Sequence, residues 1–243
     1  MRIAALFDIH GNLPALEAVL HDVRQAGVDL VVVGGDVLPG PMPHESLGVL
    51  RALALPVRCI RGNGDRIVME SRAGEESPEV PAAFREVVRW NATQLTPSDV
   101  AFVSDWPVTF RQYVAGVGDV LFCHATPRSD TENFTRLTPE AHILPAFGGV
   151  AADVIVCGHT HMQFDRTIGA HRVVNAGSVG MPFGAPGACW LLLGARVELR
   201  HTSYDLDAAA DRIVATAYPQ AQHFAEQNVR HQPTEQAMLA ALS

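Results

Sequence analysis

The sequence lacks the features that would place the protein in a disulfide-rich class or on duplex nucleic acid. Its 243 residues include four cysteines, and no two of them form a CxxC pair. We therefore expect buried free thiols, as in a protein of a reducing cytoplasm. Acidic residues outnumber basic ones, 26 to 18, and the formal net charge is -8. Because binding to duplex nucleic acid depends on a basic surface that releases counterions from phosphates, this charge argues against such a partner.

Long apolar runs and a leader are missing as well. No stretch approaches the roughly 20 apolar residues that a membrane-spanning helix needs. After Met1 and Arg2 a strand-like run begins at once, which leaves no room for the basic and apolar regions of a signal peptide. We expect a cytoplasmic protein without a membrane partner. Whether it forms a homo-oligomer is left open.

Short apolar runs alternate with segments of helical periodicity. Between the first two runs, Leu13, Leu16 and Leu20 share one helical face, and Gly27 follows as a C-cap residue would. Strand, helix and strand in this order predict parallel pairing with right-handed crossovers, and thus an α/β fold. The apolar runs expected to be buried strands are residues 3–7, 30–33, 57–60, 120–123, 154–157 and 189–193.

The middle of the chain departs from this rhythm. A loop rich in Glu, Ser and Pro at 74–81 precedes a segment of helical periodicity at 82–94. We predict one domain, 1–243, with a helical cap insertion at about 66–106 that shapes substrate choice. Residues 108–114 and 120–123 are expected to form a hairpin, and residues 206–217 a helix.

Polar side chains that bind metals follow the ends of the predicted strands. Each one alone is typical of a turn or of a buried histidine. All of them together, in one order and at the sheet edge where open α/β folds present their crevice, predict a functional site. The segments are Asp8-Ile9-His10, Gly35-Asp36, Gly62-Asn63-Gly64-Asp65, His124, Gly158-His159-Thr160-His161 and Asn175-Ala176-Gly177-Ser178.

In this order the segments resemble the motifs DxH, GD, GN[H/C][D/E], H and GHxH of the calcineurin-like metallophosphoesterases. The resemblance spans most of the chain and is closest to the small bacterial phosphodiesterases and their relatives that hydrolyse dinucleoside tetraphosphates. It implies a four-layer α/β/β/α sandwich of two mixed sheets, with two metal ions at the edge that both sheets share. It also implies a small phosphorylated substrate, for example a nucleotide.

The resemblance assigns a role to each motif residue. Carboxylate, imidazole and amide ligands without a thiolate suit Mn, our first choice, or Fe, Zn, Co and Ni. Two such ions would turn a shared water into hydroxide at neutral pH, and that hydroxide would attack the phosphorus. By this resemblance, Asp8, His10 and His161 hold one ion, Asn63, His124 and His159 hold the other, and Asp36 bridges the two.

Four further residues are candidates for substrate contact or catalytic support. Asn12 would contact the phosphoryl group or stabilise a turn. Asp65 would orient a ligand or cap the following helix. Arg128 would clamp a phosphate or stay solvated. Asn175 begins a turn that would support the site or hold a phosphate.

One position departs from the family pattern. Where relatives place a His or Cys after the motif Asn, this chain has Gly64, which can neither donate a proton nor stabilise charge through a side chain. We therefore expect a preference for leaving groups of low pKa, unless His44 replaces the missing acid. Two alternatives remain: a symmetrical dinucleoside tetraphosphatase, and a binding scaffold with little catalytic activity.

Overall fold

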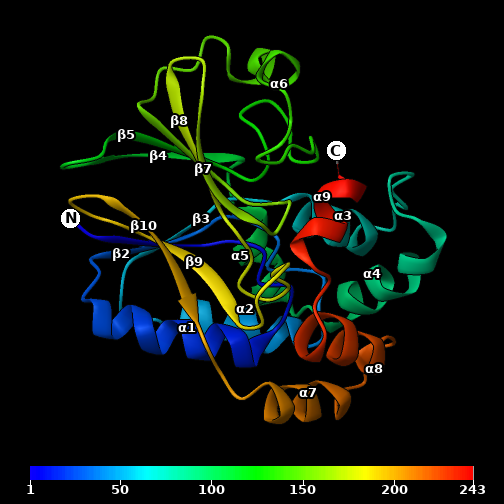
Figure 1. Ribbon diagram of the computed structural model, residues 1–243. Helices are drawn as coiled ribbons and strands as arrows, with labels where there is room; N and C mark the ends of the chain where they lie inside the picture. Colours follow the sequence, from blue (N-terminus) through cyan, green and yellow to red (C-terminus); the bar gives the residue numbers. More distant parts are fainter. Residues whose placement is uncertain (243) are drawn as a thin grey trace.

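The computed structural model, which describes residues 1–242, contains two five-stranded sheets (Figure 1). The strand order is β10-β9-β1-β2-β3 in the first sheet and β4-β5-β6-β8-β7 in the second. The strands are β1 (Ile3–Leu6), β2 (Leu30–Val33), β3 (Val57–Cys59), β4 (Thr109–Val114), β5 (Gly118–Cys123), β6 (Val154–Cys157), β7 (Gln163–Ile168), β8 (His171–Ala176), β9 (Ala188–Leu193) and β10 (Val197–Thr202). The helices are α1 (Leu13–Ala26), α2 (Pro43–Arg51), α3 (Asn63–Arg72), α4 (Ala82–Gln94), α5 (Pro97–Ser104), α6 (Glu140–Phe147), α7 (Leu206–Val214), α8 (Ala221–Phe224), the π-helix η1 (Ala225–Arg230) and α9 (Glu235–Ala241).

Both sheets are mixed, and their parallel strands bring the predicted motifs to one edge. Strand β1 pairs in parallel with β2, and β2 with β3, as the strand-helix-strand pattern predicted. In the second sheet, β6 pairs in parallel with both β5 and β8. Between β1 and β2, α1 ends at Gly27, whose left-handed φ of 61° suits glycine. The carboxyl ends of β1, β2, β5 and β6 therefore all deliver motif residues.

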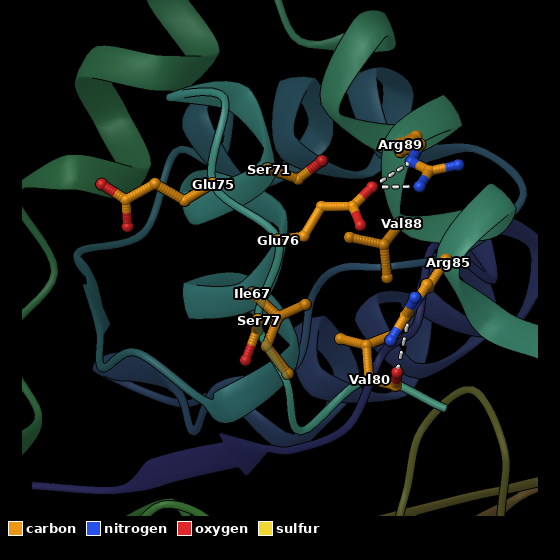
Figure 2. A pocket seen from close by; sticks show the side chains of 9 residues that line it. All are labelled: Ile67, Ser71, Glu75, Glu76, Ser77, Val80, Arg85, Val88 and Arg89. Atoms are coloured by element: carbon orange, nitrogen blue, oxygen red, sulfur yellow. Dashed lines mark hydrogen bonds and ion pairs between the residues drawn. The ribbon is translucent and has the colours of Figure 1, made fainter. Parts of the chain in front are cut away.

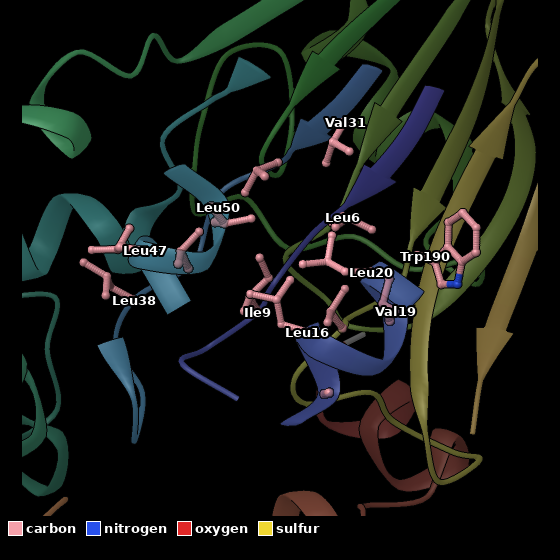
Figure 3. Close-up of a cluster of buried hydrophobic side chains, with 14 of the residues drawn as sticks. Leu6, Ile9, Leu16, Val19, Leu20, Val31, Leu38, Leu47, Leu50 and Trp190 are labelled. Atoms are coloured by element: carbon pink, nitrogen blue, oxygen red, sulfur yellow. The ribbon is translucent and has the colours of Figure 1, made fainter. Parts of the chain in front are cut away.

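Alternation along β1 explains the layers. Ile3 and Ala5 pack into the cluster between the sheets, which also contains Phe122 of β5. Ala4 and Leu6 point the other way, into the cluster that α1 and α2 cover (Figure 3). On the outer face of the second sheet, α6 packs over another buried cluster (Figure 1). The predicted four-layer α/β/β/α sandwich is confirmed.

The segment at 66–106 packs against the first sheet's helical layer. Helix α4 coincides with the helix predicted at 82–94. Helix α3 begins at Asn63, before the predicted start of the insertion at about 66, and α5 was not predicted. Val88 of α4 and Val103, in α5, belong to the same buried cluster as α1 and α2. The Asn91 side chain of α4 accepts a hydrogen bond from Gly40 N (3.0 Å), so the segment also braces the loop after β2. Within residues 1–242, no helix has the length and apolar character to cross a membrane.

Candidate metal centre

Backbone strain is concentrated at the predicted metal ligands. A positive φ is unfavourable for residues that carry a Cβ, at about 1–3 kcal/mol each, and such strain clusters at functional sites. Among the described residues, the non-glycine positions with positive φ are Asp8 (54°), His10 (45°), Asp36 (51°), His159 (67°) and His161 (58°). All five belong to the predicted ligand set. The folded chain therefore holds this geometry against its local preference.

The same residues form two clusters at the sheet edge. In the first, Asp8, His10 and His161 place their ligand atoms within 4.8 Å of one another. In the second, Asp36, His124 and His159 do the same. These are the carboxylate and imidazole members of the two sets that sequence analysis proposed. Residues about 150 positions apart are thus brought together.

Asp36 lies between the clusters. Its Oδ1 is 3.4 Å from His124 Nε2, and its Oδ2 is 3.8 Å from His10 Nε2. The turns that carry the two clusters are also joined through their backbones, since Asp8 N donates to Gly35 O (3.1 Å) and His10 N to Asp36 O (2.9 Å). One carboxylate therefore faces imidazoles of both clusters, as a bridging ligand would.

Asn63, the remaining member of the predicted set, begins α3 beside the second cluster. It is flanked by two glycines that contact Asp36: Gly64 N donates to Asp36 Oδ1 (2.7 Å), and a Cβ at Gly62 would lie 2.2 Å from the same oxygen. The Asn63 Oδ1 atom is buried and has no hydrogen-bond partner. Asn63 therefore lies in the turn that contacts Asp36, and its buried oxygen is left without a partner.

Backbone carbonyls orient the imidazoles. His124 Nδ1 lies 3.0 Å from Gly34 O, His161 Nδ1 lies 2.8 Å from Met181 O, and His10 Nδ1 lies 3.3 Å from Pro39 O. A carbonyl accepts a hydrogen bond from Nδ1–H, and in the neutral imidazole this leaves the Nε2 lone pair free to bind a cation. The Nε2 atoms of His10 and His161 approach to 3.2 Å, so both rings point at the same place.

Unpaired polar atoms test whether these residues fit metal ions. Asp8 Oδ1, Asn63 Oδ1 and His124 Nε2 are buried and have no hydrogen-bond partner, although such atoms are normally satisfied. Each belongs to a predicted ligand, and each is a group that binds a divalent cation. The donor set therefore fits two divalent ions, one for each cluster.

The electrostatics of the clusters follow from burial and close opposite charges. Burial opposes protonation of His124, yet Asp36 and Asp8 raise its pKa to about 10. Burial and the nearby His124 lower the pKa of His159 to about 4. Burial alone would raise the pKa of Asp36, but the imidazoles of His124 and His10 hold it well below its usual range. At neutral pH, Asp36 is ionised and His159 is neutral, which are the states that bind metal.

A sequence profile of the calcineurin-like phosphoesterase superfamily domain matches residues 1–196. The chain belongs to this superfamily. It is accordingly a metal-dependent phosphoesterase, and family membership implies divalent metal ions. The segment after residue 196, which contains β10 and α7 to α9, lies outside the matched part.

Relatives match most of the chain in sequence, and solved structures match it in fold. An uncharacterized protein of Methanocaldococcus jannaschii is 27% identical over 241 residues, which cover 90% of this chain and 94% of that protein. The phosphodiesterase YfcE of Escherichia coli is 26% identical over 202 residues, 79% of this chain and 87% of its own. The fold matches a metallophosphoesterase from Sphaerobacter thermophilus with a TM-score of 0.74 at 24% identity, covering 94% and 99% of the two chains. A hypothetical protein from Pyrococcus horikoshii gives a TM-score of 0.80 at 18% identity, covering 96% and 99%.

Asp65 supports the metal centre of this phosphoesterase from behind. Its buried carboxylate accepts hydrogen bonds from the backbone N–H groups of Asp36 (2.8 Å), Leu38 (3.0 Å) and Gly62 (3.0 Å). Burial, together with the negative charge of Asp36, raises the pKa of Asp65 to about 7. These contacts fit both roles considered from the sequence, since Asp65 ties the turn of Asp36 to the turn of Asn63 and caps α3 through Gly62 N.

Gly64 has no room for the side chain that relatives carry there. A Cβ at this position would lie 2.3 Å from Leu38 O and 3.0 Å from Pro39 Cδ. The loop after β2 thus occupies the place of a side chain. A histidine at position 64 would require this loop to move. The backbone around residue 64, and not only the residue itself, therefore excludes an acid side chain here.

The proposed replacement, His44, is engaged elsewhere. His44 lies in α2, and its Nδ1 is 2.7 Å from Oδ2 of Asp99 in α5. Asp99 also pairs with Arg51 (2.8 Å) and caps α5 through Thr96. These contacts give His44 a structural partner outside the metal clusters, and its role as a general acid has no support in the geometry.

The two candidate asparagines are fully buried. Asn12 caps α1 by accepting from Ala15 N (3.2 Å), and its amide donates to Gly180 O (2.9 Å). Asn175 donates to Gly158 O (2.6 Å) and so braces the turn that carries His159 and His161. Asn175 thereby has the supporting position that sequence analysis favoured. A substrate contact by Asn12 stays a prediction.

Arg128 lies on a pocket next to the second cluster. The pocket has a volume of about 310 Å³, and its lining includes His124, Thr126, Arg128 and Asp130. Arg128 is half-exposed and donates from Nε to Glu132 Oε2 (2.9 Å). The pocket lining therefore contains both a predicted metal ligand, His124, and the accessible guanidinium of Arg128.

A second hollow, between α3 and α4, is not part of the centre. It is lined by residues of the 66–106 segment, where Glu76 pairs with Arg89 across the opening (Figure 2). Its volume of about 10 Å³ is that of roughly one water molecule. No predicted ligand lines it.

The predicted Asn175–Ser178 turn reaches the first cluster, but Gly180 and Met181, which follow it, were not among the predicted site residues. Besides Met181 O, Ser178 contributes, because its hydroxyl donates to Asp8 O (2.7 Å), and Gly180 N donates to the same carbonyl (2.9 Å). The Asn-Ala-Gly-Ser turn signalled that this region is tightly folded. Nothing in the sequence showed that the turn contacts Asp8.

Proposed function

We propose that this phosphoesterase is a binuclear enzyme that hydrolyses phosphodiesters. Asp8, His10 and His161 would hold one divalent ion, Asn63, His124 and His159 the other, and Asp36 would bridge them. The observation that carries the proposal is the convergence of buried unpaired ligand atoms on strained backbone, at one edge of both sheets. Manganese is our first choice, because hard and borderline oxygen and nitrogen donors predominate.

The chain's own groups would hold the reactants in place. Bound divalent ions supply an ionised water as nucleophile and neutralise the phosphoryl oxygens. Asp36 stays ionised at neutral pH and faces both clusters, so it would fix their separation. The Gly64 N–H holds Asp36 Oδ1, and Asp65 holds the Asp36 backbone, so this carboxylate cannot rotate freely.

The pocket beside His124 would accept one ester substituent of the substrate. Arg128 supplies a cation and Asp130 a carboxylate to its lining, while Val108 and Pro127 supply apolar surface. Both charges are already paired, Arg128 with Glu132 and Asp130 with Arg66, so this lining suits a substituent with little net charge. A chain of several phosphates would meet Asp130 as well as Arg128, so we favour a phosphodiester over the dinucleoside tetraphosphate that sequence analysis also considered.

Gly64 and the Leu38 carbonyl define the leaving-group preference. Without a proton donor at this position, the leaving group must depart as an anion, which is easy only when its pKa is low. General acid catalysis is worth roughly 10²–10⁴ in rate. We expect aryl diesters to be hydrolysed at least about 100-fold faster than matched dialkyl diesters. Equal rates for the two would show that another group donates the proton.

The central test combines metal content with turnover. The Asp36→Asn variant, reconstituted with manganese, should lose bound metal by elemental analysis and lose turnover of bis(p-nitrophenyl) phosphate. Asp29→Asn is the control, because Asp29 is an exposed aspartate that pairs with the N-terminus. If the unmodified protein held no metal, or if Asp36→Asn kept both metal and turnover, the proposal would fail. Metal binding without turnover would select the binding scaffold.

A further inference from the structure

The loop after β8 contacts the back of a predicted metal ligand. His161 Nδ1 lies 2.8 Å from Met181 O. The ring of Phe183 stacks on the imidazole, with centroids 5.1 Å apart and an interplanar angle of 28°. Phe183 N also donates to His161 O (3.3 Å). The loop therefore restricts both the tilt and the rotation of this imidazole.

The C-terminal segment, residues 233–241, in turn holds this loop. Gly184 N, next to Phe183, donates to Pro233 O (2.9 Å). Directly afterwards, Thr234 caps α9 by accepting from Ala237 N (3.2 Å). Leu239 of α9 is buried, with 5% of its surface exposed, so the helix is packed onto the body of the protein.

A second contact ties α9 to the loop before α6. Arg136 lies in this loop, and its Nε donates a hydrogen bond to the Glu235 carboxylate (2.9 Å). That loop is itself fixed, because Arg166 of β7 donates to the carbonyls of Thr135 (3.0 Å) and Thr138 (2.8 Å). The segment 233–241 thus links the Phe183 loop to the second sheet.

We propose that Phe183 is a positioning residue for His161, and that the segment 233–241 keeps Phe183 in place. The segment would thereby set the affinity of the ion held by Asp8, His10 and His161. This inference rests on the ligand assignment made above. It adds to it, because residues 233–241 lie beyond the part of the chain that the superfamily profile matches. Groups that orient a ligand from behind typically change metal affinity 10–100-fold when removed.

The test measures manganese affinity in full-length variants by competition with a fluorescent chelator. Phe183→Ala removes the stacked ring and should weaken one of the two sites roughly tenfold. Phe183→Tyr keeps the ring and should bind like the unmodified protein. Leu239→Asp places a charge in the buried face of α9 and should weaken the same site. Cobalt substitution gives a second readout, since a tilted imidazole alters the visible absorption of that ion.

A milder pair of variants guards against misfolding. Glu235→Ala should weaken the same site by roughly 2-fold to 5-fold, the range expected for an exposed ion pair. Glu17→Ala breaks an equally exposed pair with Arg212 and should leave both sites unchanged. Unchanged affinity in Phe183→Ala and Leu239→Asp would overturn the inference.

His161→Ala separates the two proposals. If it loses one ion while Phe183→Ala loses none, the ligand assignment holds and the positioning role fails. If His161→Ala binds both ions as tightly as the unmodified protein, the ligand assignment itself fails.

Discussion

Replacing Gly64 by alanine tests whether the loop after β2 occupies the place of a side chain. Gly64 lies in the first turn of α3, where alanine is ordinarily favoured over glycine by up to about 1 kcal/mol. The contact with Leu38 O opposes that gain. A new Cβ would lie 2.3 Å from this oxygen, roughly 1 Å closer than an ordinary van der Waals contact.

The size of the effect depends on how easily Leu38 can move. Its side chain is fully buried, and its backbone N–H is held by Asp65 Oδ1 (3.0 Å). Overpacking of this kind destabilises by about 1–3 kcal/mol. After subtracting about 1 kcal/mol for the helix preference, we expect Gly64→Ala to lower the free energy of unfolding by up to about 2 kcal/mol. In a chain of this length, the melting temperature would fall by up to roughly 8 °C.

Gly48→Ala is the matched control, because a Cβ at Gly48 in α2 has nothing within 4 Å. It should stabilise by about 0.5–1 kcal/mol, as glycine-to-alanine changes in helices do. Urea and thermal unfolding of both variants, without metal, measure the difference. If Gly64→Ala were as stable as Gly48→Ala, the close approach of Leu38 would be wrong. A folded Gly64→His variant with faster dialkyl diester turnover would show that the loop after β2 has room for a side chain at position 64, and so would also refute the steric argument.

Three further outcomes follow from the centre and the thiols. Chelation of manganese held at 100 times its dissociation constant should lower the stability by about 2.7 kcal/mol, and an unchanged melting temperature would contradict metal binding to the folded state. Because Asp36 and Asp8 raise the pKa of His124 to about 10, the metal-free protein carries a proton there at pH 7.5. Metal binding should therefore release about one proton, measured by calorimetry in two buffers of different ionisation enthalpy. The manganese affinity should rise with pH up to about 10, and the absence of proton release would refute this prediction. Burial raises the pKa of Cys123 to about 12, so this thiol should react with a thiol reagent at pH 8 only after unfolding; rapid labelling of the native protein would contradict that.

The strands and the convergence of the motif residues could be predicted because both follow from local sequence patterns. Buried strands such as β2 and β6 are continuous apolar runs, and α1 shows helical spacing closed by Gly27. Parallel strands end at one edge, so residues that follow them, such as Asp36 and His159, must meet there. The order of the motifs then gave the predicted ligand assignment, by resemblance to the family. These steps need no knowledge of contacts between distant segments.

The contacts that surround the ligands could not be predicted in this way. Nothing local indicates that Leu38 O fills the space over Gly64, or that Phe183 stacks on His161, because each contact joins separate loops. The short helices α8 and α9 and the π-helix between them lack a long apolar periodicity, since each buries only one or two side chains. The sequence predicted a helical cap insertion at about 66–106 but not where its side chains pack. Val88 and Val103 of this segment contribute to the cluster outside the first sheet.

The glycines beside the ligands have a steric reason that spans two turns. A Cβ at Gly62 would lie 2.2 Å from Asp36 Oδ1, and one at Gly158 would lie 2.4 Å from Asp8 Oδ2. In each case the side chain that needs the space belongs to a different strand end. Because the turns pack so closely, a glycine in one turn leaves room for the carboxylate of another. A Cβ at Gly158 would also lie 2.6 Å from the Phe7 ring, so a substitution there would displace Asp8, a predicted ligand, or the buried ring beside it. The spacing of the motifs is thus linked to the geometry of the centre.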